Sequence, residues 1–490
     1  MVKMDKDEQK PHAIFVGYPL QGHVIPAVHL AIKLASKGFT ITFVNTDAIH
    51  HKTSEARLDS SAAAADDDDI FAGARKAGLD IRYRTVADGL PLDFDRSVNH
   101  DQFMASLLHV FSAHVEVLVG KIIKSEEPPV TCLIADTFFV WPSMIAKKFG
   151  LLYVSFWTEP ALVFNLYYHI HLLRSNSHFA CQDKRKDTID YIPGVASIEP
   201  TDLTSYLQDT DTTTVCHQII CKSFEEARGA DFVLCNTVQE LEPNTISALQ
   251  LEKPFYAVGP IFPTKSFVAT SLWSESDCTQ WLNTKPHGSV LYVSFGSYAH
   301  VSKEEIVEIA KGLQLSKANI VWVLRPDIVV SNEGDPLPDG FREEMGERGL
   351  IVQWCRQMEV LKHPAVGGFL THCGWNSILE TISCGVPLLC FPLLTDQFTN
   401  RKLVVDDWRI GMDLCRRKNQ VTKDEVADKI NRLMSGKDGE KYREEIKRLR
   451  KTLENAMAVG GSSGRNLDRF IVELMERTAA ASHQSKEVRI

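Results

Sequence analysis

The stretch from Trp354 to Gln397 contains the kinds of side chains that a nucleotide sugar needs. It offers an indole for stacking, a histidine and amides for phosphate, a carboxylate for ribose, and a closing carboxylate and amide for hexose hydroxyls. No single one of these residues is diagnostic, but their order fits a short strand at 367–370, a tight turn at 371–374 and a helix at 375–383. Free backbone N–H groups and the positive end of a helix dipole would meet at that turn. The sequence therefore predicts an anion site there.

This stretch resembles the signature box of plant family-1 glycosyltransferases, the UDP-dependent enzymes that glycosylate small lipophilic molecules, and the resemblance extends over nearly the whole chain. It implies that Trp354 stacks on uracil and that Gln357 contacts the base and the ribose. Glu380 would take the ribose hydroxyls, and Asp396 and Gln397 the sugar hydroxyls. The other residues that the resemblance places at the donor in this half of the chain are Ser297, His372, Gly374, Trp375, Asn376 and Ser377.

One position departs from the pattern of that family. Arg356 stands where the family usually has proline, often preceded by alanine where this chain has Cys355. Proline fixes φ and removes a backbone donor, so its replacement is expected to loosen the turn and to add a charge near the uridine site. The geometry of the Gln357 contact depends on that turn.

Length and composition set the broad class. A chain of 490 residues is too long for one ordinary core, so two domains are expected. Hydrophobic residues make up 44% of the chain and charged residues 24%, which is typical of a soluble globular protein. The 54 basic and 63 acidic residues give a net charge of −9 without a long basic run, so nucleic acid is not an expected partner.

The cysteines and the amino terminus indicate the compartment. Eleven cysteines are scattered without a C-x-x-C pair, which favours reduced thiols. The first ten residues are highly charged and lead directly into an apolar strand, so we expect no secretory signal. No apolar run is long enough to span a bilayer. We therefore expect a cytoplasmic enzyme with no integral membrane association.

The first half of the chain begins with a predicted βαβ unit. Residues 13–16 fit an apolar strand, 24–36 a helix and 39–44 a second strand, the start of a parallel sheet. His23 comes at the start of the helix, and Asp136 ends a later strand candidate at 130–135. Because ligands bind at the carboxyl ends of parallel strands, these two side chains are expected to lie together.

The family resemblance gives this pair a role. It implies that His23 is the base, that Asp136 orients it, and that Thr158 reaches the distal hydroxyl of the donor sugar. Histidine suits the role because its ordinary pKa of about 6.5 leaves it neutral yet basic near pH 7. A metal and a cofactor are not required by this scheme, since the charge of the leaving diphosphate would fall on His372, Ser377 and helix amides.

The predicted class is α/β with the GT-B fold, two Rossmann-like domains facing across a cleft, as the resemblance also implies. Residues 1–258 are expected to form an acceptor-binding domain, 259–274 a Pro-, Ser- and Thr-rich linker, and 275–465 a UDP-sugar-binding domain. Residues 466–490 would form a helix returning to the first domain, frayed from Ala479 onward. The Ala- and Asp-rich tract at 54–69 is expected to be a surface loop.

Three alternatives can be weighed against this function. Ser462 lies in a G-x-S-x-G pattern, which is typical of a hydrolase nucleophile, but helices are predicted on both sides where a strand should precede the serine. The spacing of His363, His372 and Cys373 fits no common zinc pattern. The remaining alternative is a binding protein that holds a nucleotide sugar or a lipophilic ligand without turnover, and the presence of both His23 and Asp136 argues against it.

The sequence thus predicts an inverting O-glycosyltransferase. Its donor is expected to be UDP-glucose, because a terminal glutamine in the box goes with glucose in this family. Its acceptor is expected to be a small lipophilic metabolite of plant secondary metabolism, such as a phenolic, flavonoid, lignan or terpenoid. The enzyme is expected to be a monomer.

Overall fold

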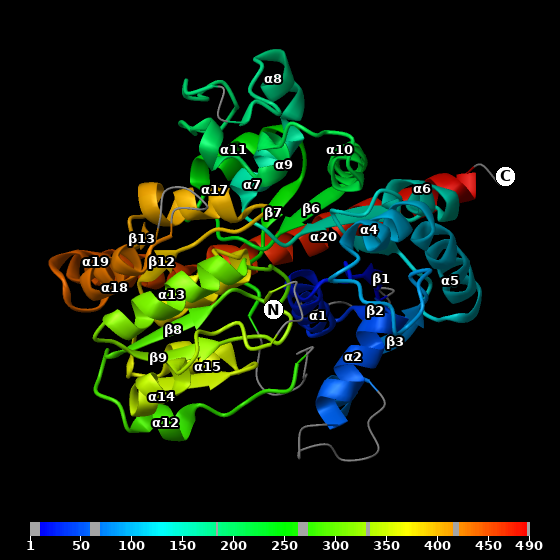
Figure 1. Ribbon diagram of the computed structural model, residues 1–490. Coiled ribbons are helices and arrows are strands. Elements are labelled where there is room, and N and C mark those ends of the chain that lie inside the picture. Colours follow the sequence, from blue (N-terminus) through cyan, green and yellow to red (C-terminus); the bar gives the residue numbers. More distant parts are fainter. Residues whose placement is uncertain are drawn as a thin grey trace. The chain divides into compact units, whose positions relative to one another are not determined.

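The computed structural model describes residues 10–58, 69–182, 185–262, 273–329, 334–414 and 421–487 (Figure 1). The chain divides into two compact units. The first consists of Met1–His169, Asp211–Leu272 and Met457–Ile490, and the second of Ile170–Thr210 and Trp273–Ala456. Each unit is built around its own parallel sheet. This arrangement confirms the predicted α/β class with two Rossmann-like sheets, whereas the predicted domain boundaries and the cleft stay predictions.

The sheet of the first unit has seven parallel strands in the order β3-β2-β1-β4-β5-β6-β7. The strands are β1 His12–Val16, β2 Thr40–Thr46, β3 Ile81–Val86, β4 Cys132–Asp136, β5 Leu152–Trp157, β6 Phe232–Cys235 and β7 Phe255–Ala257. The strand order reverses direction between β1 and β4, because β2 and β3 lie on one side of this pair and β5 to β7 on the other. In open α/β sheets that reversal marks the ligand-binding edge.

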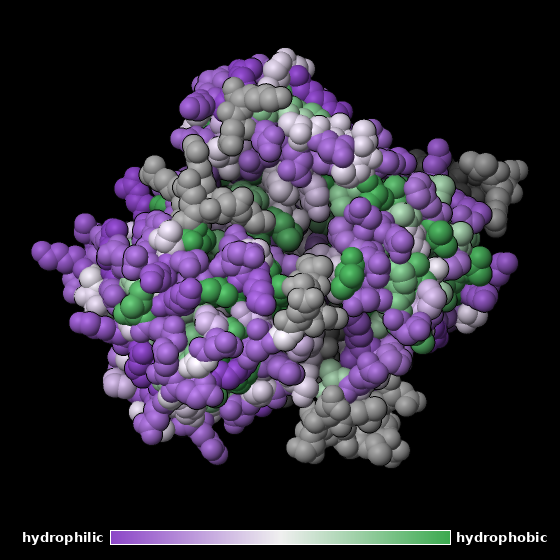
Figure 2. Space-filling model, viewed as in Figure 1, coloured by the Kyte–Doolittle hydropathy of each residue, from purple (hydrophilic) through white to green (hydrophobic). Residues whose placement is uncertain are grey.

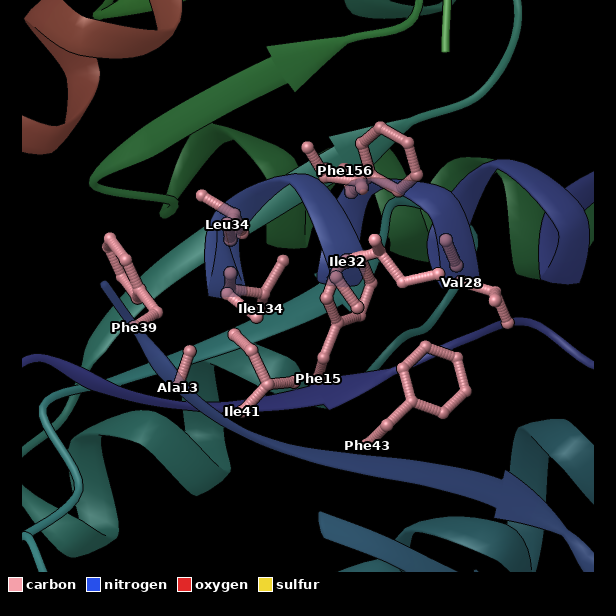
Figure 3. Close-up of a cluster of buried hydrophobic side chains, with 14 of the residues drawn as sticks. Ala13, Phe15, Val28, Ile32, Leu34, Phe39, Ile41, Phe43, Ile134 and Phe156 are labelled. Carbon is pink, nitrogen blue, oxygen red and sulfur yellow. The ribbon is translucent and has the colours of Figure 1, made fainter. Parts of the chain in front are cut away.

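The helices of the first unit surround this sheet. They are α1 Gln21–Ala35, α2 Asp47–Leu58, α3 Ala72–Lys76, α4 His100–His109, α5 Phe111–Ser125, α6 Pro142–Phe149, α7 Ala161–Tyr168, α10 Val215–Arg228, α11 Pro243–Glu252 and α20 Ser462–Glu487. Apolar side chains of α1, such as Val28 and Ile32, pack on Phe15, Phe43 and Phe156 of the strands, as Figure 3 shows. Burying this face fixes α1, and with it His23, against the centre of the sheet.

The second unit has six parallel strands in the order β10-β9-β8-β11-β12-β13. They are β8 Val290–Ser294, β9 Asn319–Val323, β10 Gly349–Val352, β11 Val366–Thr371, β12 Leu388–Cys390 and β13 Gly411–Asp413. The helical segments are α8 Ile170–Ser175, η2 Pro200–Asp202, α9 Ser205–Gln208, α12 Thr279–Asn283, α13 Lys303–Leu315, α14 Phe341–Met345, η3 Gly346–Arg348, α15 Gln357–Lys362, α16 Trp375–Cys384, α17 Gln397–Lys402, η4 Leu403–Asp407, α18 Lys423–Ser435 and α19 Lys437–Met457. Here the order reverses between β8 and β11, the two strands that precede Ser297 and His372.

Some local predictions were wrong. The final helix, α20, starts at Ser462 and continues to Glu487, so most of the expected frayed tail is helical. Phe470 explains why this helix is held, since it is buried against Phe232 and Tyr256 in the core of the first unit. Part of the expected loop at 54–69 belongs to α2. Most of that loop, and residues 263–272 of the expected linker, lie outside the described residues.

Hydrophilic side chains cover most of the face in Figure 2, interrupted by smaller hydrophobic areas. Among the described residues, no single helix is long and apolar enough to cross a membrane. The bent pair α4 and α5, with 45° between its helices, passes that test by length and composition only.

Candidate active site

His23 and Asp136 meet at the carboxyl edge of the first sheet, as the sequence predicts. β1 and β4 pair in parallel with Val16 opposite Ala135, so the turn after β1 lies next to Asp136 at the end of β4. The backbone N–H of His23 donates to the carbonyl of Leu20 (2.9 Å) in the first turn of α1. That bond places the imidazole over the strand ends.

The imidazole and the carboxylate are directly hydrogen-bonded. Nδ1 of His23 lies 2.8 Å from Oδ2 of Asp136, and the side chains are 13% and 2% exposed. The other oxygen of Asp136 accepts from the backbone N–H of Phe138 (2.9 Å). An ionised Asp136 can only accept, so Nδ1 carries the proton in this pair and Nε2 keeps its lone pair. This tautomer is the one that a general base needs.

Thr158 has a contact that sequence reasoning missed. It follows β5, the neighbour of β4, and its Oγ1 lies 2.8 Å from Nδ1 of His23. The side chain is buried, at 3% exposure. Three strand ends therefore converge on one imidazole. The predicted contact of Thr158 with the donor sugar stays a prediction.

In the second unit, His372 lies where two adjacent strands end. β8 and β11 pair with Ser294 opposite Thr371, and α16 starts at Trp375 after the turn. The imidazole fits between Gly296 and Gly374, because a Cβ added at either glycine would come within 2.4 or 2.5 Å of its Nε2. Gly296 also has a φ of +73°, which side chains with a Cβ rarely adopt. The predicted turn and helix start are thus present, with glycine required on both sides of the ring.

Burial and the nearby charge of Arg325 lower the pKa of His372 to about 4, so the ring is neutral in the free protein.

Arg325 itself is a second residue that sequence reasoning missed. It follows β9, is 1% exposed, and donates to the carbonyls of Gly296 and Ala299, the residues on either side of the segment that carries Ser297. One feature of the sequence could have indicated Arg325, namely its position directly after an apolar strand. Its Nε donates to Asp327 (2.8 Å), so the guanidinium forms an ion pair and holds the turn after β8 in place.

Gln357, Ser377 and Glu380 form one hydrogen-bonded group. The side-chain amide of Gln357 donates to Oγ of Ser377 (3.0 Å) and to Oε2 of Glu380 (2.7 Å). Its own oxygen accepts from the hydroxyl of Tyr292 (3.2 Å). Burial raises the pKa of Glu380 to about 7, and the bond from Gln357 opposes that rise. The group can therefore exchange a proton near neutral pH.

Trp354 and Arg356 flank the buried Cys355. Trp354 packs on the hydrophobic cluster of β8, β9 and β11, and its ring lies 6.2 Å from that of Trp273, at an angle of 26°. Arg356 precedes α15 with a φ of −73°, a value that proline also adopts, so the turn keeps its shape without proline. The expected loosening of the turn stays a prediction, and the added charge is paired with Glu359 (2.9 Å) and Glu275 (3.6 Å).

Asp396 and Gln397 lie buried at the start of α17, at 7% and 5% exposure. The side-chain oxygen of Gln397 accepts from the backbone N–H groups of Leu393 (2.9 Å) and Leu394 (3.1 Å). These bonds occupy the side-chain oxygen, so the NH₂ group is the part of the amide that can donate to another partner. Asp396 is an acceptor, so the pair offers both polarities to adjacent hydroxyls.

Two other site predictions concern the start of α16. Trp375 is buried with its ring 6.1 Å from Trp408, and Asn376 is partly exposed beside it. Two links between predicted donor residues are present in the second unit: Gln357 binds Ser377 and Glu380, and Asn400 connects Asp396 (2.5 Å) with the carbonyl of Cys373 (2.9 Å), the residue after His372. Among the described residues, His100, Asp101 and Cys216 have donor atoms within 4.8 Å of one another, close enough for a metal, but they take part in neither link.

Comparison with known proteins identifies the class that this fold and site define. A family described as UDP-glucoronosyl and UDP-glucosyl transferase matches residues 123–459. UDP-glycosyltransferase 86A1 of Arabidopsis thaliana is 61% identical over 474 residues, covering 96% of this chain and 95% of the relative. Linamarin synthase 1 of Manihot esculenta is 33% identical over 489 residues, with 96% and 98% coverage.

Solved structures agree with the sequence relatives. Phytolacca americana UGT2, complexed with UDP-2fluoro-glucose and pterostilbene, is 26% identical, with a TM-score of 0.76 and coverage of 95% and 100%. Medicago truncatula UGT71G1, complexed with UDP-glucose, is 24% identical with a TM-score of 0.79 and coverage of 95% and 98%, and shares the fold. The chain belongs to the plant UDP-glycosyltransferases of the GT-B fold. It is an enzyme that transfers a sugar from a UDP-sugar to a small acceptor.

Proposed function

We propose that this enzyme transfers glucose from UDP-glucose to a hydroxyl of a small lipophilic plant metabolite, with inversion at the anomeric carbon. The observation that carries the proposal is the bond between Nδ1 of His23 and Asp136, because it leaves Nε2 as a base at the ligand-binding edge of the sheet. The acceptor is proposed to be a phenolic, flavonoid, lignan or terpenoid.

The reaction is a single displacement. Nε2 of His23 takes the proton of the acceptor hydroxyl while the oxygen attacks the anomeric carbon from the side opposite the diphosphate. The bond between that carbon and the diphosphate oxygen breaks, and UDP leaves with the electron pair. Asp136 stabilises the positive charge that the imidazole gains, and Thr158 limits the rotation of the ring. His23 then releases its proton to solvent.

The donor is assigned to the second unit. Trp354 stacks on uracil, Gln357 contacts the base and ribose, and Glu380 accepts from the ribose hydroxyls. The diphosphate meets the N–H groups at the start of α16, which lie next to His372 and Ser377. Arg325 supports this assignment, because its bonds to the carbonyls of Gly296 and Ala299 hold the segment that carries Ser297 close to His372.

Glucose is the proposed sugar because Asp396 and the NH₂ group of Gln397 offer an acceptor and a donor to neighbouring hydroxyls. Galactose differs from glucose in the direction of one such hydroxyl. We therefore expect UDP-glucose to outcompete UDP-galactose when both are supplied in equal amounts with one phenolic acceptor. Mass spectrometry cannot separate the two products, so chromatography against standards of both glycosides is the measurement. A galactoside as the dominant product, or a xyloside when UDP-xylose replaces UDP-galactose in the competition, would refute the sugar assignment.

Glu380 gives a pH dependence to donor binding. Its pKa of about 7 in the free protein lies above the ordinary carboxyl range, so the group is mostly protonated below neutral pH and ionised above it. Only the carboxylate can accept from both ribose hydroxyls. The affinity for UDP-glucose should therefore increase about tenfold from about pH 6 to about pH 8.

Calorimetry with UDP-glucose tests this dependence, since its diphosphate has no free terminal phosphate to titrate in this range. Glu380→Gln should bind more weakly and lose the pH dependence. His372 does not interfere, because its pKa of about 4 lies below the range. An unchanged slope in Glu380→Gln would move the titrating group elsewhere.

The alternative is a protein that binds a nucleotide sugar without turnover. Incubation with UDP-glucose and a panel of phenols and alcohols distinguishes the two, because only the enzyme releases UDP together with a glucoside.

We also propose that the enzyme works in the cytoplasm as a monomer. The ten cysteines within the described ranges are free thiols, which supports a reducing compartment.

A further inference from the structure

Thr395, the residue before Asp396, has an unfavourable backbone conformation. Its φ is +57°, in the left-handed region that β-branched residues rarely adopt. Such a conformation persists only where surrounding contacts impose it, and it is common at ligand sites. The contacts that impose it here come from a distant segment of the same unit.

Ser205, at the start of α9, forms two hydrogen bonds with Thr395. Its backbone N–H donates to the carbonyl of Thr395 (3.0 Å), and its Oγ accepts from the backbone N–H of Thr395 (3.0 Å). Both backbone groups of the strained residue are therefore held by one serine. The hydroxyl of Thr395 in turn donates to Oδ1 of Asp396 (2.7 Å).

The same segment is anchored a second time by Asp202. The backbone carbonyl of Asp202 accepts from Oγ1 of Thr399 (2.7 Å), and its carboxylate accepts from Arg401 (2.9 Å). Thr399 is fully buried. Residues 202–205 thus hold the chain at Thr395, before α17, and at Thr399, within α17, on either side of Asp396 and Gln397.

We propose that Ser205 is a positioning residue for recognition of the donor sugar. Its two bonds hold Thr395 in the left-handed conformation, and Thr395 then directs the carboxylate of Asp396 and the start of α17 toward the sugar hydroxyls. This inference rests on the proposed function, because it assigns Asp396 and Gln397 to the sugar. Ser205 touches neither substrate nor reacting atoms in this account, and its effect passes entirely through Thr395 and Asp396.

The test is Ser205→Ala, which removes the Oγ acceptor but keeps the backbone bond to Thr395. The KM for UDP-glucose should rise about 3- to 10-fold, the effect of losing one hydrogen bond, and the preference for UDP-glucose over UDP-galactose should fall by a similar factor. The Kd of UDP should not change, because UDP lacks the glucose that Asp396 and Gln397 are proposed to bind. Ser205→Thr keeps the hydroxyl and should restore the wild-type KM. Thr201→Ala, at an exposed neighbouring position, is the matched control.

Two results would overturn the inference. One is a Ser205→Ala enzyme whose KM and sugar preference match those of the wild type. The other is an equal loss of affinity for UDP and UDP-glucose, which would indicate a general structural role. If the wild type itself fails to bind UDP or to transfer glucose, the proposed function fails first, and the inference fails with it.

Discussion

Replacing His23 by alanine is expected to lower the rate of transfer to an aliphatic alcohol by about 10²- to 10⁴-fold, the usual contribution of a general base. The loss should be smaller for an acidic phenol, because a phenol ionises more readily without help. The effect follows from the geometry at the β1 and β4 ends, where Nε2 is the only ring nitrogen of His23 not bonded to Asp136 or Thr158. Turnover of both acceptors should be measured under saturating UDP-glucose.

Asp136→Asn tests the second member of the pair. Asparagine keeps the size of the side chain but cannot stabilise a charged imidazole, so the rate should fall by less than in His23→Ala. The double variant should be little slower than His23→Ala, because residues that act as one unit give non-additive losses. His51→Ala, an exposed histidine of the same unit, is the control. Strictly multiplicative losses, or near-wild-type transfer to the alcohol by His23→Ala, would place the base elsewhere.

Replacing Trp354 by alanine is expected to weaken the binding of UDP by about 1 to 3 kcal/mol, the usual contribution of a nucleobase stacked on an aromatic ring. Calorimetry with UDP measures this loss without requiring turnover. Because the free energy comes from the base, UDP and UDP-glucose should lose the same amount, in contrast to Ser205→Ala.

Trp281→Ala is the matched control for that experiment. Both tryptophans are partly buried and pack on the same hydrophobic cluster of the second unit, so both substitutions remove similar packing. Only Trp354→Ala should change the affinity of the folded protein for UDP. Equal affinity in Trp354→Ala and the wild type would remove the uridine assignment.

The sequence predicted those parts of the site that depend on strand order and on local motifs. A βαβ pattern at the start of the chain and a strand ending at Asp136 were enough to bring His23 and Asp136 together, because parallel strands end at the same edge. The turn at 371–374 and the helix after it were predictable from local signals. These signals are the glycines and the histidine of the turn and the apolar periodicity of the helix.

Contacts between segments far apart in the chain could not be predicted in this way. Ser205 and Thr395 are hydrogen-bonded to each other, yet neither belongs to a recognisable motif. Thr158 was singled out, but its contact with His23 depends on the reach of a side chain across β4 and β5, which strand patterns do not give. Arg325 has a role only because β9 lies next to β8 and brings it to the carbonyls of Gly296 and Ala299.

Packing overrode one local pattern, whereas the flanking helices predicted around Ser462 are present. The polar composition after Ala479 suggested a frayed end, but α20 is anchored by Leu467, Phe470 and Leu474 in the first core and continues as a helix to Glu487. Ser462 fits a hydrolase pattern, yet it begins this helix and its hydroxyl donates to Glu240 (2.8 Å). A serine bonded to a carboxylate, with a helix rather than a strand before it, is not a nucleophile elbow.

The most direct test of the account is the anomeric configuration of the product. The wild-type enzyme should be incubated with UDP-glucose and one accepted phenol, and the purified glycoside examined by proton NMR. UDP-glucose carries an α-linked sugar, so single displacement assisted by His23 predicts a β-glucoside and one UDP released for each glucoside formed. An α-glucoside, or release of UDP and free glucose without a glycoside, would contradict the account.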